Sequence, residues 1–167
     1  QFDIEGYYDA QDVNTHARPR LLFAGEVTQF EDLDKLMRFY QIKYCVVDVA
    51  PETRKALEFA NRFHGFVRLC RYNHHIQAKN ISTTEEGEMI ISVNRTSWLD
   101  LTLGRFKKQQ IMLPIDLPRD FQAQIQAQIR VPKREKDGNP GAFYETPGNL
   151  KDHYAHSLNY AEIALPF

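Results

Sequence analysis

The chain has 167 residues, of which 43% are hydrophobic and 12% aromatic, and its formal net charge at pH 7 is −1. This composition excludes a disordered chain, and the length is sufficient for one domain with a sizeable core. No apolar stretch approaches the length of a membrane span, so we predict none, and the net charge shows no large basic excess. Basic side chains nevertheless cluster within residues 105–108 and 133–136, so nucleic-acid binding is not excluded.

Hydrophobic periodicity predicts strands and helices that alternate along most of the chain. Residues 1–20 are polar and mixed, and we assign no element there. The predicted strands cover residues 21–27, 44–47, 66–72, 89–93, 129–131 and 142–144. The predicted helices cover residues 30–40, a segment from Pro51 that stops at Gly65, a segment opened by Ser97 and Asp100 as a capping box, residues 120–128, and a C-terminal segment after Asn149. Residues 73–87 are polar and are predicted to form a loop.

Strands that alternate with helices at this spacing predict an α/β layered domain with a partly parallel sheet. The sequence shows no internal repeat and no Pro- or Ser-rich linker, so we expect a single domain over residues 1–167. Cys45 and Cys70 lie inside apolar runs, which is typical of reduced core cysteines in a cytosolic protein. Asp137-Gly138, between two short strands, predicts a β-hairpin turn.

Asp48 is the first candidate functional residue, because it ends the apolar run Tyr44-Cys45-Val46-Val47. Side chains at strand ends of an α/β sheet emerge from a rigid edge into a crevice. A carboxylate in that position suits Mg²⁺ or Mn²⁺, and hence phosphate chemistry. A structural role stays open, in which Asp48 accepts hydrogen bonds from the free N–H groups of the helix that starts near Pro51.

Asp152 is the second candidate, at the start of the last predicted helix. Here too a structural role stays open, because Asn149 is a good N-cap and Asp152 three residues later completes an arrangement like a capping box. Asp152, His156 and Asn159 share one helix face, opposite Leu158, and such a polar stripe is typical of a solvated surface.

Four short segments, in this order and spacing, carry a resemblance to a known family. They are Gly25-Glu26-Val27 with residues 30–33, residues 46–52 with the helix that follows, Asn94-Arg95-Thr96 with residues 111–114, and residues 151–156 with Tyr160 and Ala161. Together they resemble the C-terminal nuclease domain of the large terminase subunit of tailed bacteriophages, a member of the RNase H-like superfamily. The resemblance covers roughly residues 21–165.

The resemblance implies an RNase H-like mixed central sheet flanked by helices, with a β-hairpin near the active site. It also implies a metal-dependent DNA endonuclease that cuts concatemeric viral DNA during genome packaging, with a pair of Mg²⁺ or Mn²⁺ ions. Asp48 matches the family's carboxylate on the central strand, and Asp152 matches the carboxylate on the C-terminal helix. His153 is adjacent to that match, and we assign it a supporting role at most.

The same resemblance implies double-stranded DNA as the substrate and the host-cell cytoplasm as the location. The implied partners are an N-terminal packaging ATPase domain, the portal and the small terminase subunit, with no membrane. Lys133, Arg134 and Lys136, in the predicted hairpin, are candidates for contacts to DNA phosphates. The alternative is that this charged tip only keeps the surface soluble.

One departure from the family concerns its first catalytic aspartate, which lies on the first strand and is followed by glycine. Phe2-Asp3-Ile4-Glu5-Gly6 matches that pattern only faintly, so we expect the first strand to lie upstream of this chain. Two other function classes therefore stay open. One is a non-catalytic RNase H-like module that docks onto DNA, the portal or the ATPase domain, and the other is a resolvase or transposase-type relative with a different DNA target.

Overall fold

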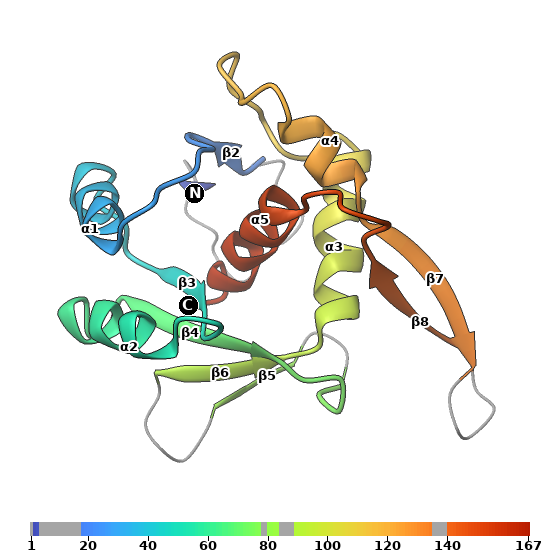
Figure 1. Cartoon of the computed structure of the whole chain (residues 1–167), viewed down its shortest axis with the longest axis horizontal. Helices are drawn as coiled ribbons and strands as arrows, with labels where there is room; N and C mark the ends of the chain where they lie inside the picture. Colours follow the sequence, from blue (N-terminus) through green and yellow to red (C-terminus); the bar gives the residue numbers. More distant parts are fainter. Residues whose placement is uncertain (1, 4–17, 78–79, 84–88, 135–139) are drawn as a thin grey trace.

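A four-stranded mixed sheet lies at the centre of the fold (Figure 1). The structure is a computed structural model and describes residues 2–3, 18–77, 80–83, 89–134 and 140–167. The strands follow the order β3 (Cys45–Asp48), β4 (Val67–Tyr72), β6 (Ile90–Val93) and β5 (Ile81–Thr83). β3, β4 and β6 are parallel, whereas β5 is antiparallel to β6. The predicted α/β class with a partly parallel sheet is therefore confirmed.

Helices cover both faces of this sheet (Figure 1). On one face, α1 (Phe30–Phe39) and α2 (Thr53–Arg62) pack against β3 and β4 in one buried apolar cluster. On the other face, α3 (Arg95–Lys107) and α5 (His153–Ala164) pack against β4 and β6 in a second cluster. The short helix α4 (Phe121–Gln126) lies against α5. No helix in the described parts of the chain is long and apolar enough to cross a membrane.

The two-residue periodicity of the strands decides which side chains face α5. On β4, Val67 and Leu69 point toward α1 and α2 and are essentially unexposed. On β3, Val47 packs in that same cluster, whereas Val46 packs in the cluster that contains α5. Asp48, two residues after Val46, therefore projects on the α5 side of the sheet.

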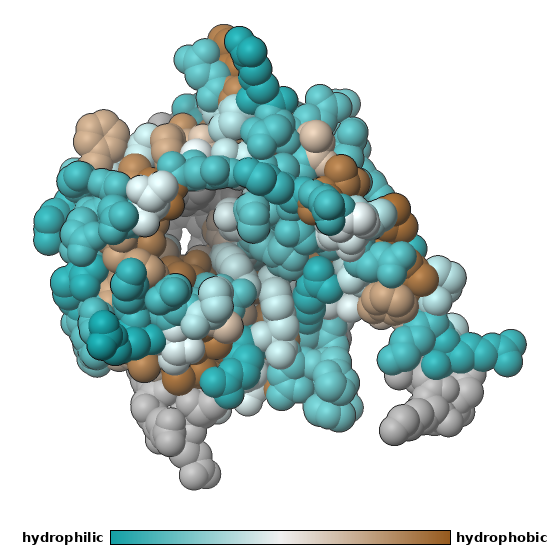
Figure 2. Space-filling view, in the orientation of Figure 1, coloured by the Kyte–Doolittle hydropathy of each residue, from teal (hydrophilic) through white to brown (hydrophobic). Residues whose placement is uncertain are grey.

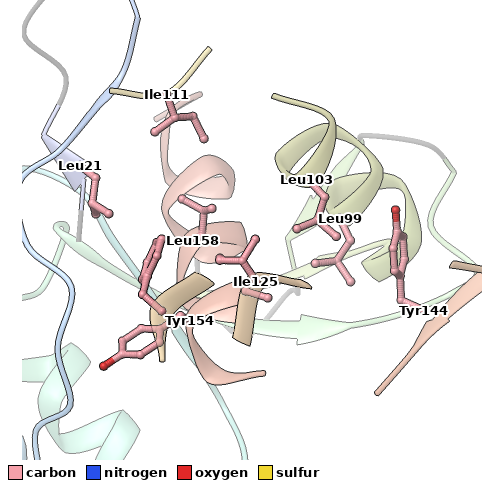
Figure 3. Close-up of a cluster of buried hydrophobic side chains, with 10 residues drawn as sticks. Leu21, Leu99, Leu103, Ile111, Ile125, Tyr144, Tyr154 and Leu158 are labelled. Atoms are coloured by element: carbon pink, nitrogen blue, oxygen red, sulfur yellow. The ribbon is translucent and has the colours of Figure 1, made fainter. Parts of the chain in front are cut away.

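A further buried cluster surrounds the apolar face of α5 (Figure 3). Tyr154 and Leu158 of α5 pack there with Ile125 of α4, Leu103 of α3 and Leu21. Full burial of a large apolar side chain stabilises the folded state by about 1.5–3 kcal/mol. This cluster therefore fixes the N-terminal half of α5 between α3 and α4, whereas Tyr160 and Ile163 pack in the cluster against the sheet.

Two pairs of strands lie outside the central sheet. β1 (Phe2–Asp3) pairs antiparallel with β2 (Arg20–Leu21), and β7 (Ile129–Arg134) pairs antiparallel with β8 (Pro140–Glu145). The predicted hairpin strands are thus confirmed and are longer than expected. Asp3, the faint match to the family's first aspartate, is placed in the β1–β2 pair and not in the central sheet.

Several predicted boundaries are wrong. Of the strand expected over residues 21–27, only Leu21 is in a strand, and its backbone partners are β1 and Met112; residues 22–27 pair with no strand in the described parts of the chain. The loop expected over residues 73–87 contains β5, whose side chains are mostly exposed and so lack a core pattern. The hairpin turn at Asp137-Gly138 lies outside the described residues.

The helix starts also differ from prediction, for reasons visible at the caps. The side chain of Asn94 accepts a hydrogen bond from the backbone N–H of Ser97 (3.0 Å), so α3 begins at Arg95 and the capping box at Ser97 is wrong. α2 begins at Thr53, two residues after Pro51. Gly65, with a φ of 85°, follows the end of α2 and supplies the left-handed conformation that a helix stop favours.

We expect Thr102→Val to lower the free energy of unfolding by about 1–3 kcal/mol, because it leaves a buried amide oxygen without its donor. The hydroxyl of Thr102 on α3 donates to Oδ1 of Asn159 on α5 (2.8 Å), and both residues are 0% exposed. Urea unfolding measures the change. Thr83→Val, at an exposed position of β5, is the matched control; equal losses in the two variants would contradict the role of this contact.

Candidate functional site

Asp48 lies at the C-terminal end of β3 and is exposed. Its Oδ2 accepts a hydrogen bond of 2.6 Å from the hydroxyl of Tyr160 on α5, and its Oδ1 accepts one of 3.0 Å from the backbone N–H of Ala50. The N-cap of α2 is Glu52, so Asp48 does not cap that helix. Asp48 therefore does not have the alternative role of accepting hydrogen bonds from the start of α2. It instead makes a local turn contact to Ala50 and a contact across the fold to α5.

Asp152 is itself the N-cap residue of α5, which corrects the prediction of Asn149 as the cap. Its side chain makes no capping hydrogen bond. Instead, its Oδ2 accepts from Nε2 of Gln128 (2.6 Å) and from the hydroxyl of Thr146 (2.7 Å). Both donors belong to the root of the β7–β8 hairpin, because Gln128 precedes β7 and Thr146 follows β8. The carboxylate therefore ties the start of α5 to the hairpin.

The Asp152 carboxyl favours its charged form. Partial burial works against ionisation, but the hydrogen bond from Thr146 and the positive charge of nearby side chains, including Arg95, hold the pKa below its ordinary value. Asp152 is consequently a carboxylate at neutral pH and can attract a cation.

A polar network connects the two carboxylates across α5. His156 lies one turn after Asp152, and its Nε2 is 3.4 Å from Oδ2 of that residue. Nδ1 of His156 is hydrogen-bonded to the hydroxyl of Tyr72 on β4 (3.1 Å). The ring of Tyr72 stacks on the ring of Tyr160, with a centroid distance of 5.5 Å and an interplanar angle of 16°. Tyr160 in turn donates to Asp48.

Helix periodicity explains this arrangement. Residues four apart fall on one face of an α-helix, so Asp152, His156 and Tyr160 form one row along α5. The Cα atoms at the two ends of the row are about 12 Å apart along the helix axis, and the side chain of Tyr160 leans back toward the N-terminus. Asp152 and the contact partner of Asp48, Tyr160, thus lie on the same face of α5, and Tyr72 and His156 lie between the two carboxylates.

Arg95, the first residue of α3, connects this network to the β7–β8 hairpin. Its guanidinium donates to the backbone oxygen of Tyr144 on β8 (2.8 Å) and lies 3.3 Å from Nε2 of His156. Burial, together with the charge of Arg95, keeps the pKa of His156 below its ordinary value. His156 is therefore a neutral imidazole at neutral pH, held between a cation and a carboxylate.

The polar stripe of α5 is fully buried at Asn159 and half-buried at Asp152 and His156, so the prediction of a solvated face is wrong. Asn159 is 0% exposed, since its amide donates to the hydroxyl of Tyr72 (2.9 Å) and its Oδ1 accepts from Thr102. The polar partners come from β4 and α3, which are distant in sequence. No role was predicted for Tyr72, Tyr160 or Arg95, although Tyr160 and Arg95 lie in the segments that carry the resemblance; the spacing of Tyr160 from Asp152 and His156 was the available signal.

In the described parts of the chain, the hydrogen bonds of this network do not involve the other predicted site residues. His153 directly follows Asp152 as the exposed first residue of α5, and its charge helps to lower the pKa of the Asp152 carboxyl. Lys133 and Arg134 are exposed at the end of β7, on a hairpin that extends away from the central sheet (Figure 1). Lys136 lies outside the described residues. The base of the hairpin is fixed to α3, because Asp100 accepts hydrogen bonds from Arg130 (2.8 Å) and from the Tyr144 hydroxyl (2.8 Å).

No set of three or more His, Cys, Asp or Glu side chains is placed to hold one metal ion in the described parts of the chain. Comparison of the chain with protein-family models, curated proteins and solved structures finds no match.

We expect the stability of the fold to decrease as the pH falls below 6.5, the ordinary pKa of histidine, in part because of His156. Its pKa is lowered in the folded state, so the unfolded chain takes up the proton first; above that pH both states are neutral and the full stability is present. His156→Gln should flatten this part of the pH dependence of urea unfolding. The exposed His64→Gln variant should retain it, and identical profiles for wild type and His156→Gln would disprove this contribution.

Proposed function

We propose that the chain is a divalent-metal-dependent DNA endonuclease of the RNase H-like class, in which Asp48 and Asp152 bind the cations. The observation that carries the proposal is that these two carboxylates, which the sequence separates by about a hundred residues, meet the same face of α5. One comes from the end of a parallel strand, where ligands commonly bind in α/β sheets. The other comes from the N-terminus of a helix.

The donor set is compatible with Mg²⁺ or Mn²⁺. Within the described residues, Oδ1 of Asp152 accepts no hydrogen bond, and each oxygen of Asp48 accepts one. A carboxylate has about four lone-pair positions, so both groups keep acceptor capacity. Mg²⁺ is usually bound through one or two carboxylates, together with water and substrate phosphate. A cation held by either carboxylate would therefore be completed by water and by the phosphate of DNA.

The surrounding residues hold the carboxylates in place. Tyr160 fixes the rotamer of Asp48, while Thr146 and Gln128 fix that of Asp152. When bound, the metal would supply an activated water and stabilise the leaving oxygen of the phosphodiester. His156 stays neutral and restrains both Tyr72 and Asp152, so the row on α5 keeps one geometry.

The β7–β8 hairpin is the proposed contact to DNA. Lys133 and Arg134 are exposed near its tip, and its root holds Asp152 through Thr146 and Gln128. Contacts from lysine and arginine to phosphates position a duplex without reading its sequence. A DNA backbone that follows the hairpin is thereby directed toward the carboxylates.

The biological setting follows from the resemblance and is part of the proposal. The substrate is concatemeric double-stranded viral DNA, cut during genome packaging in the host-cell cytoplasm. The packaging ATPase domain, the portal and the small terminase subunit are the proposed partners.

A second candidate function is a non-catalytic RNase H-like module that docks onto DNA, the portal or the ATPase domain. The observation in its favour is that Tyr72 and His156 stand between the two carboxylates, as the contacts along α5 show. The two candidates differ in whether the chain cleaves DNA.

We expect Asp48→Asn and Asp152→Asn each to reduce Mn²⁺-dependent nicking of supercoiled plasmid by at least about 100-fold, since a lost metal ligand removes several kcal/mol of transition-state stabilisation. Asp116→Asn, at an exposed loop position, is the matched control and should nick at the wild-type rate. Chelator should abolish the nicking. DNA binding without any nicking by the wild type would instead support the docking module.

We expect Lys133→Ala combined with Arg134→Ala to weaken DNA binding equally for unrelated sequences. The slope of log affinity against log salt should become shallower by up to about 2, because each lost phosphate contact contributes about 0.9. The matched control changes Arg54 and Lys55 to alanine on the exposed side of α2, with the same loss of charge. Fluorescence anisotropy with labelled duplexes measures both; equal effects of the two double variants would exclude the hairpin as the contact.

A further inference from the structure

The end of the central sheet that lies opposite Asp48 carries exposed aromatic side chains. Tyr44 comes directly before β3 and is 47% exposed, and Phe66 comes directly before β4 and is 46% exposed. The two are neighbours, because the N–H of Cys45 donates to the backbone oxygen of Phe66 (2.8 Å). Phe39, at the end of α1, is 78% exposed. On the α1 side of the molecule, Figure 2 shows hydrophobic side chains at the surface among hydrophilic ones.

Contacts between rings and guanidinium groups join the elements at this end of the sheet. The guanidinium of Arg38, in the last turn of α1, lies 5.8 Å from the centre of the Phe63 ring at the end of α2. The guanidinium of Arg68 on β4 lies 5.7 Å from the centre of the Phe167 ring, which is 6.4 Å from the ring of Tyr44. Figure 1 likewise shows the C-terminus beside β3 and β4. The ends of α1 and α2 and the last residue therefore lie together at the starts of β3 and β4.

We refer to residues 38–44, 62–68 and 165–167 as the basic–aromatic surface. These segments contain no aspartate or glutamate, and their basic side chains are Arg38, Lys43, Arg62, His64 and Arg68. One charge is neutralised from outside the surface, because Asp34 pairs with Arg62 (2.8 Å). The chain as a whole has a net charge of −1, so positive charge is concentrated here. A surface with such an excess attracts polyanions.

The exposed rings decide which polyanion fits the basic–aromatic surface. An aromatic ring stacks on an unpaired base of any sequence, while lysine and arginine side chains follow the phosphates of a single strand. In a duplex the bases are stacked on one another, so a duplex would use the cations but not the rings. A run of carboxylates would also use only the cations, because the face of a ring is negative. Single-stranded nucleic acid is the polyanion that uses both features.

We propose that the basic–aromatic surface binds single-stranded nucleic acid. The bases stack on the rings of Tyr44, Phe66 and Phe39. The phosphates contact Lys43 and Arg38, whose side chains are exposed. Tyr44 and the candidate cation ligand lie at opposite ends of β3, about 13 Å apart along the strand. The inference does not rest on nuclease activity, because no candidate metal ligand and no hairpin residue takes part in this binding.

Fluorescence anisotropy with a labelled oligo(dT) tests the proposal, and a labelled strand of the same length without bases is the matched probe. The wild-type protein should bind oligo(dT) at least about 10-fold more tightly than the strand without bases, because only oligo(dT) can stack on the rings. Lys43→Ala should make the slope of log affinity against log salt shallower by about 0.7. Equal affinities for the two strands, an unchanged slope, or tighter binding of polyglutamate than of oligo(dT) would each overturn the inference.

Variants of the rings locate the binding. Tyr44→Ala, Phe66→Ala and Phe39→Ala should each weaken the binding of oligo(dT) at least about 5-fold and leave that of the strand without bases unchanged. Tyr44→Trp keeps a stacking surface and should retain the wild-type affinity, as should Ile115→Ala at a fully exposed loop position. Urea unfolding confirms that each variant is folded. A loss of oligo(dT) binding in the double variant of the hairpin, but in none of the three ring variants, would place the strand on the hairpin and overturn the inference.

Discussion

The fold depends on how α5 satisfies a row of polar side chains in a position where water is largely excluded. Asn159 is fully buried and His156 is half-buried, so each needs a hydrogen-bond partner within the protein. An unpaired buried polar group costs about 1–3 kcal/mol, which is a large part of the stability of a small domain. The partners come from β4 and α3, and they fix the rotation of α5 about its own axis.

The rotation of α5 also determines which groups contact the carboxylates of Asp48 and Asp152. The rotation of α5 that gives His156 and Asn159 their hydrogen-bond partners also turns Tyr160 toward the end of β3, where its hydroxyl donates to Asp48. At the other end of the row, Asp152 meets Thr146 and Gln128 at the root of the hairpin. One helix therefore contacts the sheet, carries or contacts both candidate cation ligands, and is tied to the β7–β8 hairpin that we propose contacts DNA.

The sequence predicted the parts of this arrangement that depend on local pattern. The apolar run before Asp48 and the apolar faces of α1, α2 and α5 were sufficient to predict a layered α/β fold. Helix caps were less predictable, because Asn94 and Ser97 compete for the same role and the choice depends on contacts of Asn94 with the loop after β4. The burial of the polar stripe on α5 was not predictable, because the sequence around Asn159 does not indicate whether its hydrogen-bond partners are water molecules or the side chains of Thr102 and Tyr72. β5 was missed for a similar reason, because its stability comes from pairing with β6 and not from a core pattern.

The central claim is that Asp48 and Asp152 belong to one cation-binding region. The most direct test is a titration of the isotope-labelled protein with Mn²⁺, a paramagnetic ion that broadens NMR signals close to its site. The account predicts that the amide signals beside Asp48 and those beside Asp152 broaden together at the lowest concentrations, before signals beside exposed acidic residues such as Asp116. Broadening at only one of the two aspartates, or at neither before Asp116, would contradict it.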